Sequence, residues 1–464
     1  MTTNSTTLPP EKRKLHKVFF AARQALRRHA TGGNVLILAT ILALIVANIP
    51  GVNTLYNDFW NQEMRLQIGN FNLFSHAGHP MTVLQFINDA LMAVFFFTIG
   101  LEIKREVLVG ELASFKQALL PIMGAIGGMV VPVVIFIAMS RGSDYTAGAA
   151  IPMATDIAFS LGVLAILGSR VPLSLKIFLT TLAVVDDIGG IIVIATCYSS
   201  HIEGMYLVYA AAILAVLVIG GRMKIQSKMF YFLLGGVVWF LFLNSGIHPT
   251  IAGVLVAFTI PATPVYDPRN YVKIIRDNIS RFREDDEDRL DSRTILDHDQ
   301  MDWLKQIESA SDKVISPLQD MEDSLHPLTN YLIIPLFAFA NAGIYLLDVN
   351  PLSIVQGLSL AIIIALVAGK CLGILLFSWA TVRAGWAPMP EHSNWKMVAG
   401  IAMLGGIGFT VSLFIANLSF GDMGPEGLAL LNQAKIGIVV GSLLAGLGGF
   451  MLLRRYLPAT CEEE

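Results

Sequence analysis

The stretch LAVVDDIGGIIVIA, residues 182–195, places two adjacent carboxylates, Asp186 and Asp187, inside a long apolar run. The run begins after Pro172 and lasts until the polar segment YSSHIEG, so the two carboxylates lie near its middle. Its length matches the ~20 residues that a helix needs to cross a bilayer. A carboxylate at mid-bilayer costs about 2.5–3.5 kcal/mol on insertion scales. The pair therefore predicts a membrane helix whose carboxylates face a wet cavity and have a function.

Composition extends this prediction to the whole chain. Of its 464 residues, 54% are hydrophobic and only 14% are charged, whereas soluble proteins carry roughly a quarter charged residues. The three cysteines (Cys197, Cys371 and Cys461) show no C-x-x-C spacing, which argues against a disulfide framework or a zinc site. Residues 1–33 are basic and lead into an apolar run without a good cleavage site, so we interpret this run as a retained membrane helix. The expected fold class is an all-α polytopic membrane protein.

Apolar runs of suitable length recur along the chain, and we expect about twelve transmembrane helices. The expected spans are 33–50, 82–101, 117–139, 147–168, 172–198, 204–221, 227–243, 246–262, 327–346, 353–382, 394–418 and 432–453. If the N-terminus is cytoplasmic and the sides alternate, the short cytoplasmic segments hold 19 Lys and Arg residues and the opposite segments hold 3. Because cytoplasmic loops are enriched in these residues, the distribution supports twelve spans with both termini in the cytoplasm.

The expected organisation follows from these spans. It comprises a basic cytoplasmic N-terminus, helices 1–8, a long charged cytoplasmic loop, helices 9–12 and a cytoplasmic tail, at residues 1–33, 34–262, 263–325, 326–455 and 456–464. Residues 52–80 alternate polar and apolar side chains and predict a short external β-hairpin, with a surface loop as the alternative. The charged loop contains RFREDDEDRLD, and such a stretch is usually solvated and partly helical or disordered. A specific regulatory role is the alternative for this loop.

Few ionisable residues remain inside the spans. They are Asp89, Asp156, Asp186, Asp187 and Lys370, and His248 lies near the start of the eighth span. Adjacent positions of an α-helix point about 100° apart, so Asp186 and Asp187 cannot both face one ligand from an ideal helix. Lys370 is the cation at mid-span, and it is the natural partner of one aspartate because an unpaired buried charge is strongly destabilising.

Two spans contain residues that interrupt a helix. The fourth holds Pro152, Thr155, Asp156 and Ser160 in AIPMATDIAFSLGVL, and the eleventh holds the glycine-rich MLGGIGFTVSLF. One interrupted span in each half of the chain predicts an inverted-repeat transporter whose broken helices cross at mid-membrane. Asp156 would offset the positive helix N-termini there, and Lys370 the negative C-termini. Close helix packing is the alternative explanation of the glycines.

Long stretches of the chain closely resemble the NhaA-type sodium/proton antiporters of bacterial cytoplasmic membranes. They are ATDIAFSLGVLAILGSRVPLSLKIFLTTLAVVDDIGG (154–190), INDALMAVFFFTIGLEIKRE (87–106), SGIHPTIAGVLVAF (245–258), PLFAFANAGI (335–344), AGKCLGI (368–374) and GGIGFTVSLFIANL (405–418). The match runs in order from about residue 30 to residue 455. This family is among the known examples of inverted-repeat architecture.

The resemblance implies roles for the charged residues. It makes Asp186 and Asp187 the pair that binds sodium and protons, with Asp187 the primary sodium ligand and Asp186 the partner of Lys370. It places Thr155 and Asp156 at the crossing of the broken helices. The segment 52–80 would join two protomers into a homodimer.

The resemblance also implies a set of residues tied to pH response, namely Glu102, Glu106, His248 and Glu322. The segment LEIKREVL that contains the first two can equally be a basic stop at the cytoplasmic end of a helix. The loop 263–325 is much longer than the family's usual connection.

The expected function is a secondary active transporter, not an enzyme, that exchanges cytoplasmic sodium or lithium for external protons. The resemblance implies electrogenic, pH-regulated exchange in the bacterial inner membrane. It implies a lipid environment, no cofactor and no nucleic-acid partner. Protonated carboxylates hold sodium poorly and ionised carboxylates attract it, so competition for the same oxygens is enough to produce exchange.

Other functions remain alternatives. An antiporter for another monovalent cation shares most of the features above, and a passive cation channel would conduct sodium without moving protons. An intramembrane aspartyl protease would place its two aspartates on different helices, whereas here they are adjacent. A membrane prenyltransferase would carry D-x-x-x-D clusters, and the spans contain none.

Overall fold

The computed structural model describes residues 32–65, 67–68, 71–72, 74–76, 79–199, 202–264, 268–284, 298–345, 354, 356–421 and 423–458. The expected cytoplasmic ends lie outside the described residues up to residue 31 and from residue 459 onward. Residues 265–267 and 285–297 of the charged loop lie outside them as well.

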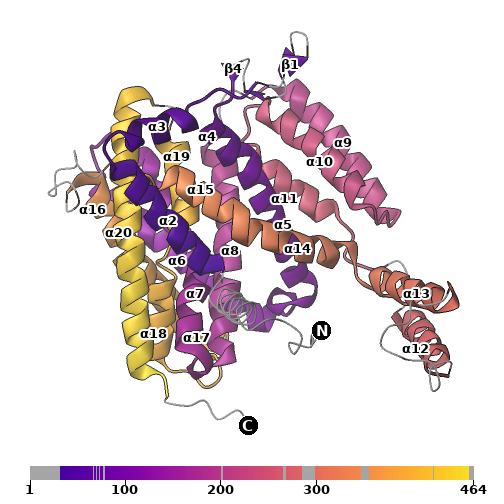
Figure 1. Ribbon diagram of the computed structural model, residues 1–464. Helices are drawn as coiled ribbons and strands as arrows, with labels where there is room; N and C mark the ends of the chain where they lie inside the picture. Colours follow the sequence, from indigo (N-terminus) through magenta and orange to yellow (C-terminus); the bar gives the residue numbers. More distant parts are fainter. Residues whose placement is uncertain are drawn as a thin grey trace, which may run out of the picture.

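Long helices over apolar runs of the sequence form one bundle, together with short helical turns that join or continue them (Figure 1). In the first part of the chain they are α2 (Gly32–Asn48), α4 (Val83–Phe86), η1 (Ile87–Leu91), α5 (Met92–Val109), η2 (Glu111–Ala113), α6 (Phe115–Met139), η3 (Thr146–Met153), α7 (Ile157–Leu167), η4 (Gly168–Arg170), α8 (Leu173–Cys197), α9 (Gly204–Arg222), α10 (Lys228–Leu243) and α11 (Thr250–Thr259). In the second part they are α14 (Pro317–Leu328), η5 (Thr329–Ile333), α15 (Ile334–Asn341), α16 (Gly357–Ile364), η7 (Ala365–Gly369), α17 (Lys370–Arg383), α18 (Trp395–Leu404), α19 (Phe409–Phe420) and α20 (Gly424–Tyr456). Of these, η1, η5 and η7 are π-helical turns, which are rare and are frequent at functional sites.

The lengths and composition of the described helices are those of a multi-pass membrane protein. Seven helices are long and apolar enough to cross a membrane, and up to nine are if each of two bent helix pairs is one span. Helices α10 and α11 are apolar but shorter. The all-helical membrane architecture expected from the sequence is therefore confirmed. The number of twelve spans and the inverted repeat stay predictions.

Apolar side chains also cover outward-facing parts of the bundle. Leu38, Ile166, Leu173 and Leu233 are 57%, 71%, 70% and 63% exposed. Soluble monomers rarely expose wide apolar patches to water, whereas lipid tails surround such side chains at no cost. The exposed residues are thus explained by a bilayer around the helices.

Residues 52–80 differ from the expected hairpin in their first part. Val52–Trp60 form helix α3, because Tyr56 and Trp60 are spaced four residues apart and are buried on one helix face. The rest is extended, with two short antiparallel pairs, β1–β2 and β3–β4, at Gln67–Ile68, Phe71–Asn72, Ser75–His76 and His79–Pro80. In Figure 1, α3, β1 and β4 lie at the same end of the bundle.

The charged loop contains helices α12 (Pro268–Glu284), α13 (His298–Val314) and α14. Helices α12 and α13 pack against each other and extend from the side of the bundle (Figure 1). Helix α14 belongs to the bundle instead, because Leu318 and Met321 are buried and α14 continues through η5 into α15. The solvated loop expected up to residue 325 therefore ends earlier, where α14 begins.

Two helix interruptions lie against each other. Residues 154–156 are extended between η3 and α7, and residues 405–408 separate α18 from α19 at a bend of 45°. The N–H of Asp156 donates to the carbonyl oxygen of Ile407 at 2.6 Å. The hydroxyl of Ser412 donates to the carbonyl oxygen of Ile151 at 2.7 Å. Backbone groups released from helical hydrogen bonds are thus satisfied by the other interruption.

Glycines bring α6 and α17 into backbone contact. A Cβ atom on Gly127 would lie 2.2 Å from the carbonyl oxygen of Gly373, and one on Gly373 would lie 2.1 Å from that of Gly127. A Cβ atom on Gly369 would lie 2.9 Å from the Cα of Pro132. Small residues allow such close packing of membrane helices, and here they fix the helix that begins at Lys370.

Candidate functional site

Lys370, Asp186 and Thr155 form a buried group at the centre of the bundle. The ammonium group of Lys370 makes an ion pair with Oδ2 of Asp186 and donates to Oγ1 of Thr155 at 2.6 Å. The Thr155 oxygen lies 2.5 Å from Asp186 Oδ2 and 2.9 Å from the carbonyl oxygen of Gly405. Its one proton can be donated to either acceptor. Because Lys370 and Asp186 are both 0% exposed, each charge needs the other.

Asp187 lies on a different face of α8 from this ion pair and lines a cavity. It is 4% exposed, and its Oδ1 has no hydrogen-bond partner among the described residues. The Oδ1 of Asp186 also lacks one within the same residues. A buried acceptor without a partner costs free energy, so each of these oxygens is a place where a proton or a cation would be stabilised.

Asp156 joins the two helix interruptions. Its Oδ1 accepts the N–H of Phe159 at 3.0 Å and so caps α7. Its Oδ2 accepts the N–H of Thr410 at 3.1 Å and the Thr410 hydroxyl at 2.7 Å. Asp156 therefore places a carboxylate beside the N-terminal turns of both α7 and α19, where helix dipoles favour negative charge. Its oxygens are occupied by these donors, unlike Oδ1 of Asp187.

The cavity has a volume of about 180 Å³, which is room for several water molecules. Its polar lining includes Glu102, His326 and Asn330 as well as Thr155 and Asp187. The side chain of His326 is 45% exposed, so a cavity with both polar and apolar walls connects a residue at the surface with the carboxylate that has a free oxygen.

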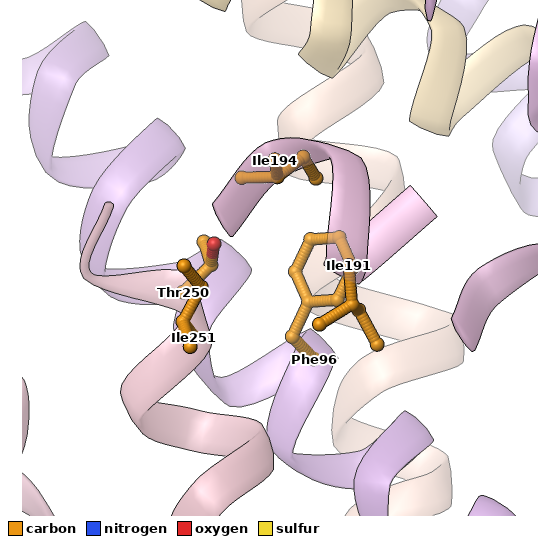
Figure 2. A pocket seen from close by; sticks show the side chains of 5 residues that line it. All are labelled: Phe96, Ile191, Ile194, Thr250 and Ile251. Carbon is orange, nitrogen blue, oxygen red and sulfur yellow. The ribbon is translucent and has the colours of Figure 1, made fainter. Parts of the chain in front are cut away.

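Beyond Asp187, helix α8 runs between apolar side chains. The next two turns of α8 contribute to a small pocket lined by Phe96, Ile191, Ile194, Thr250 and Ile251 (Figure 2). This pocket has no space for a water molecule. Along α8, Thr180 and Asp187 therefore line a cavity with room for water, whereas Ile191 and Ile194 lie in apolar packing. Within the described residues, Asp187 therefore lies between the cavity and this apolar packing.

Three of the four residues that the sequence tied to pH response lie near one arginine. Arg105 contacts Oε1 of Glu322 at 3.0 Å and Oε1 of Glu106 at 3.1 Å, and Glu102 lies one turn earlier on the same helix and lines the cavity. Glu322 precedes the predicted ninth span and is only 2% exposed. Burial raises the pKa of Glu322 to about 7, although Arg105 favours its ionised form. Glu322 thus titrates near neutral pH.

His248 is not part of that group. Its Nε2 lies 3.6 Å from Oδ1 of Asp89. Its ring packs edge-on against the ring of Phe414, with 5.3 Å between the centroids. Asp89 and Glu102 are about 20 Å apart along the same helical segment, at 1.5 Å per residue. The structure therefore places the histidine expected to respond to pH at the other end of this segment.

Sequence reasoning missed several polar residues of the cavity. Thr98, Thr180, Thr329 and Asn330 all line it, and Arg105 holds two of the glutamates. The available signal was weak, because single threonines are common in helices and carry no charge. Thr98 does interrupt the otherwise apolar run AVFFFTIGL, residues 93–101.

The donor atoms of the site suit a small hard cation. Within the described residues, no group of three or more His, Cys, Asp or Glu side chains could hold a resident metal ion. Asp187, Asp186 and Thr155 offer carboxylate and hydroxyl oxygens instead, which are the ligands that hard cations prefer. The arrangement can bind a cation or a proton at one place, with a lysine alongside.

The chain matches known proteins over almost its entire length. The family model described as Na+/H+ antiporter 1 covers residues 23–453. The Na(+)/H(+) antiporter NhaA of Phocaeicola vulgatus is 52% identical over 454 residues, 98% of this chain and 100% of that protein. That of Bacteroides fragilis is 52% identical over 429 residues, 92% of this chain and 96% of that protein.

A more distant relative gives the same result. The Na(+)/H(+) antiporter NhaA 2 of Syntrophotalea carbinolica is 44% identical over 438 residues, 92% of this chain and 95% of that protein. These similarities confirm the resemblance drawn from the sequence. The chain belongs to the Na+/H+ antiporter 1 family of multi-pass membrane transporters.

Proposed function

We propose that the protein exchanges sodium ions for protons at the carboxylates of Asp187 and Asp186. The single observation that carries the proposal is the unpartnered, buried Oδ1 of Asp187, a residue that lines the cavity. Its family membership supports the same activity, since the relatives are named as Na(+)/H(+) antiporters. Membership of a transporter family also confirms that the chain is not an enzyme.

Exchange follows from competition for the same oxygens. With Asp187 ionised, its carboxylate attracts a sodium ion arriving through the cavity, and Thr155, which lines the same cavity, would supply a further oxygen. A proton that binds Asp187 neutralises it and removes most of this attraction. Two ligands that exclude each other at one site are transported in opposite directions, provided that the site opens to one side at a time.

Lys370 sets the charge of the occupied site. Its ammonium group neutralises Asp186, so one negative charge remains on Asp187 for the cation. When sodium approaches Asp186 as well, the lysine proton and the sodium ion compete for Oδ2. We propose that this competition lets more protons than sodium ions move in each cycle, which makes exchange electrogenic. Lithium, another small hard cation, would share the site.

Alternating access requires the apolar packing beyond Asp187 to open. The cavity approaches Asp187 from the side of Glu102 and His326, which the distribution of positive residues predicts to be cytoplasmic. The packing around Ile191 and Ile194 would then separate Asp187 from the external side. Sodium would enter from the cytoplasm, and after reorientation external protons would displace it.

We propose that Glu322 contributes to regulation by pH. It titrates near neutral pH and shares Arg105 with Glu106 at the end of α5 that leads to the cavity. Ionisation of Glu322 adds a negative charge beside the cation route when the pH rises. Glu102, on the cavity wall, and His248, which pairs with Asp89, are proposed to respond to pH as well.

The cellular setting belongs to the same proposal. The protein would lie in the bacterial inner membrane with both termini in the cytoplasm. Two protomers would associate through residues 52–80, which include α3 and the strand pairs at one end of the bundle (Figure 1). No cofactor is expected for exchange of this kind.

Sodium-triggered proton movement in proteoliposomes, measured with a pH-sensitive dye, tests the proposal. The Asp187→Asn variant should show no sodium-dependent signal while eluting as a folded protein. Glu203→Gln, a substitution at an exposed carboxylate, should behave as the wild type. Normal exchange by Asp187→Asn would refute the site. Sodium flux without proton movement by the wild type would favour a channel, and a response to potassium alone would favour another cation.

A further inference from the structure

We propose that the hydroxyl groups of Thr98 and Thr329 form a second, transient cation site on the cavity wall, through which sodium passes to Asp187. This inference rests on the proposed sodium/proton exchange. It assigns a substrate-contacting role to two residues that have no charge and that lie outside the central ion-pair group.

The two threonines meet across the cavity wall. Their Oγ1 atoms are 3.2 Å apart although the residues are separated by 231 positions in the chain. Thr98 is 4% and Thr329 is 3% exposed, and both line the cavity that ends at Asp187. Thr98 comes from α5, and Thr329 is the first residue of the π-helical turn η5. Such a turn is frequent where a helix serves a site.

A count of protons shows that the pair offers acceptor oxygens. Each hydroxyl has one proton and two lone pairs. Thr98 Oγ1 donates its proton to the carbonyl oxygen of Val94 at 3.1 Å, so the bond between the two hydroxyls takes the proton of Thr329. Three lone pairs then remain on the two oxygens. No donor among the described residues is bonded to them, and they are free to contact a cation or water.

The pair lies one helical turn from the residues that lead to the surface. Glu102 is one helical turn from Thr98 on the same face of α5, about 6 Å along the axis, and His326 precedes Thr329 by one turn of its helical segment. Both outer residues line the cavity as well. The neighbouring wall is apolar, formed by Phe95, Ile99 and Ile334. A sodium ion that loses part of its water shell here needs oxygen ligands, and the two hydroxyls supply them.

Neutral oxygens suit a passing ion. A carboxylate at this point would hold the cation by its full charge and would also bind protons. Hydroxyl groups replace one or two water ligands of sodium without trapping it, and they do not titrate in the working range. The pair should therefore affect the concentration dependence of sodium transport and leave the pH dependence unchanged.

The alternative is a purely structural hydrogen bond that ties α5 to η5. Substitution separates the two, because valine keeps the shape of threonine and removes the oxygen, whereas serine keeps the oxygen. A structural role predicts that Thr98→Val/Thr329→Val lowers the melting temperature with sodium affinity intact. An ion-contacting role predicts a change in sodium affinity that serine avoids.

The experiment measures the initial rate of sodium-triggered proton movement against sodium concentration at several pH values in proteoliposomes. We expect Thr98→Val/Thr329→Val to raise the half-saturating sodium concentration about fivefold, the effect of losing about one hydrogen-bond-sized contact. The maximal rate and the pH midpoint should stay near wild-type values. Thr98→Ser/Thr329→Ser should stay within about twofold of the wild type. If the double valine variant does not fold, the single variant Thr329→Val should show the same direction of change.

Thr381→Val provides a matched control. Thr381 is 1% exposed and its hydroxyl donates to the carbonyl four residues earlier, as that of Thr98 does, but it does not line the cavity. An unchanged half-saturating concentration in both the double valine variant and Thr329→Val, with normal wild-type exchange, would overturn this inference alone. Absence of sodium-dependent proton movement in the wild type would instead refute the proposed function.

Discussion

Replacing Lys370 by methionine should destabilise the fold as well as impair transport. Methionine has a similar length and fills the space of the lysine stem without leaving a cavity. What it removes is the ammonium group that pairs with Asp186 and contacts Thr155. Because Asp186 is 0% exposed, its carboxylate would be left buried with no positive partner.

The size of the effect follows from this burial. Removing one partner of a fully buried ion pair costs about 3–5 kcal/mol, since the remaining charge keeps its desolvation cost. The double variant Lys370→Met/Asp186→Asn removes both charges. It should therefore recover most of the lost stability, and the cycle of the two single variants and the double variant measures the coupling between the residues.

Melting temperatures in detergent, read from the monodisperse fraction that survives heating at pH 8, are a suitable assay. We expect Lys370→Met to melt several degrees below the wild type and the double variant to melt between them. Lys435→Met is the control, because Lys435 is also buried, within α20, but pairs with no carboxylate of the described residues. A melting temperature of Lys370→Met equal to that of the wild type would falsify the argument that these two charges stabilise each other.

Three further substitutions test other parts of the structure. Glu322→Gln should melt increasingly above the wild type as the pH rises from 5 to 8, because a pKa raised to about 7 means that folding favours the neutral acid. The stability that the neutral Glu322 contributes to the wild type is fully present below the unfolded pKa near 4.5 and is lost as the pH rises through 7. A difference in melting temperature between variant and wild type that is constant over this range would contradict this reasoning. Gly127→Ala should destabilise the fold by about 1–3 kcal/mol through overpacking, since the added Cβ would lie 2.2 Å from the Gly373 carbonyl oxygen. The control Gly190→Ala adds a Cβ that meets no atom within 4 Å, so it should be neutral. Equal melting temperatures of the two variants would be inconsistent with the close contact. Asp156→Ala should lose about 1–3 kcal/mol by leaving buried N–H donors unsatisfied at two helix ends, and a thermal shift below one degree would argue against this capping role.

The charged residues of the site could be found from sequence because charge is costly in a bilayer. Asp186, Asp187 and Lys370 stand out from apolar runs, and the need to pair a buried lysine pointed to an aspartate. The structure contains that contact. The functional roles of these residues stay predictions.

Other features depend on packing between distant segments and could not be derived. Thr98 and Thr329 are ordinary residues by themselves, and their contact arises only when α5 lies beside η5. Arg105 sits in a basic segment that also suits a helix end, and its ion pair with Glu322 joins residues from separate helices.

Local patterns misled in one place. The alternation in residues 52–80 predicted a short β-hairpin, with a surface loop as the alternative, but Tyr56 and Trp60 are buried together on helix α3. Two large aromatic side chains spaced by four residues outweighed the period of two, because burying them on one face gains more than a short, isolated hairpin does. The strand pairs that do form are only two residues long in each strand.

The glycine contacts between α6 and α17 constrain how the transporter can move. With the backbones this close at Gly127 and Gly373, α17 has no freedom to slide past α6, and Lys370 at its first residue is carried with them as one mechanical unit. In the proposed exchange, a conformational cycle that exposes Asp187 to the opposite side would then displace other helices around this pair. Cross-linking α6 to α17 would leave turnover intact, while cross-links from this pair to the helices around it would arrest the cycle.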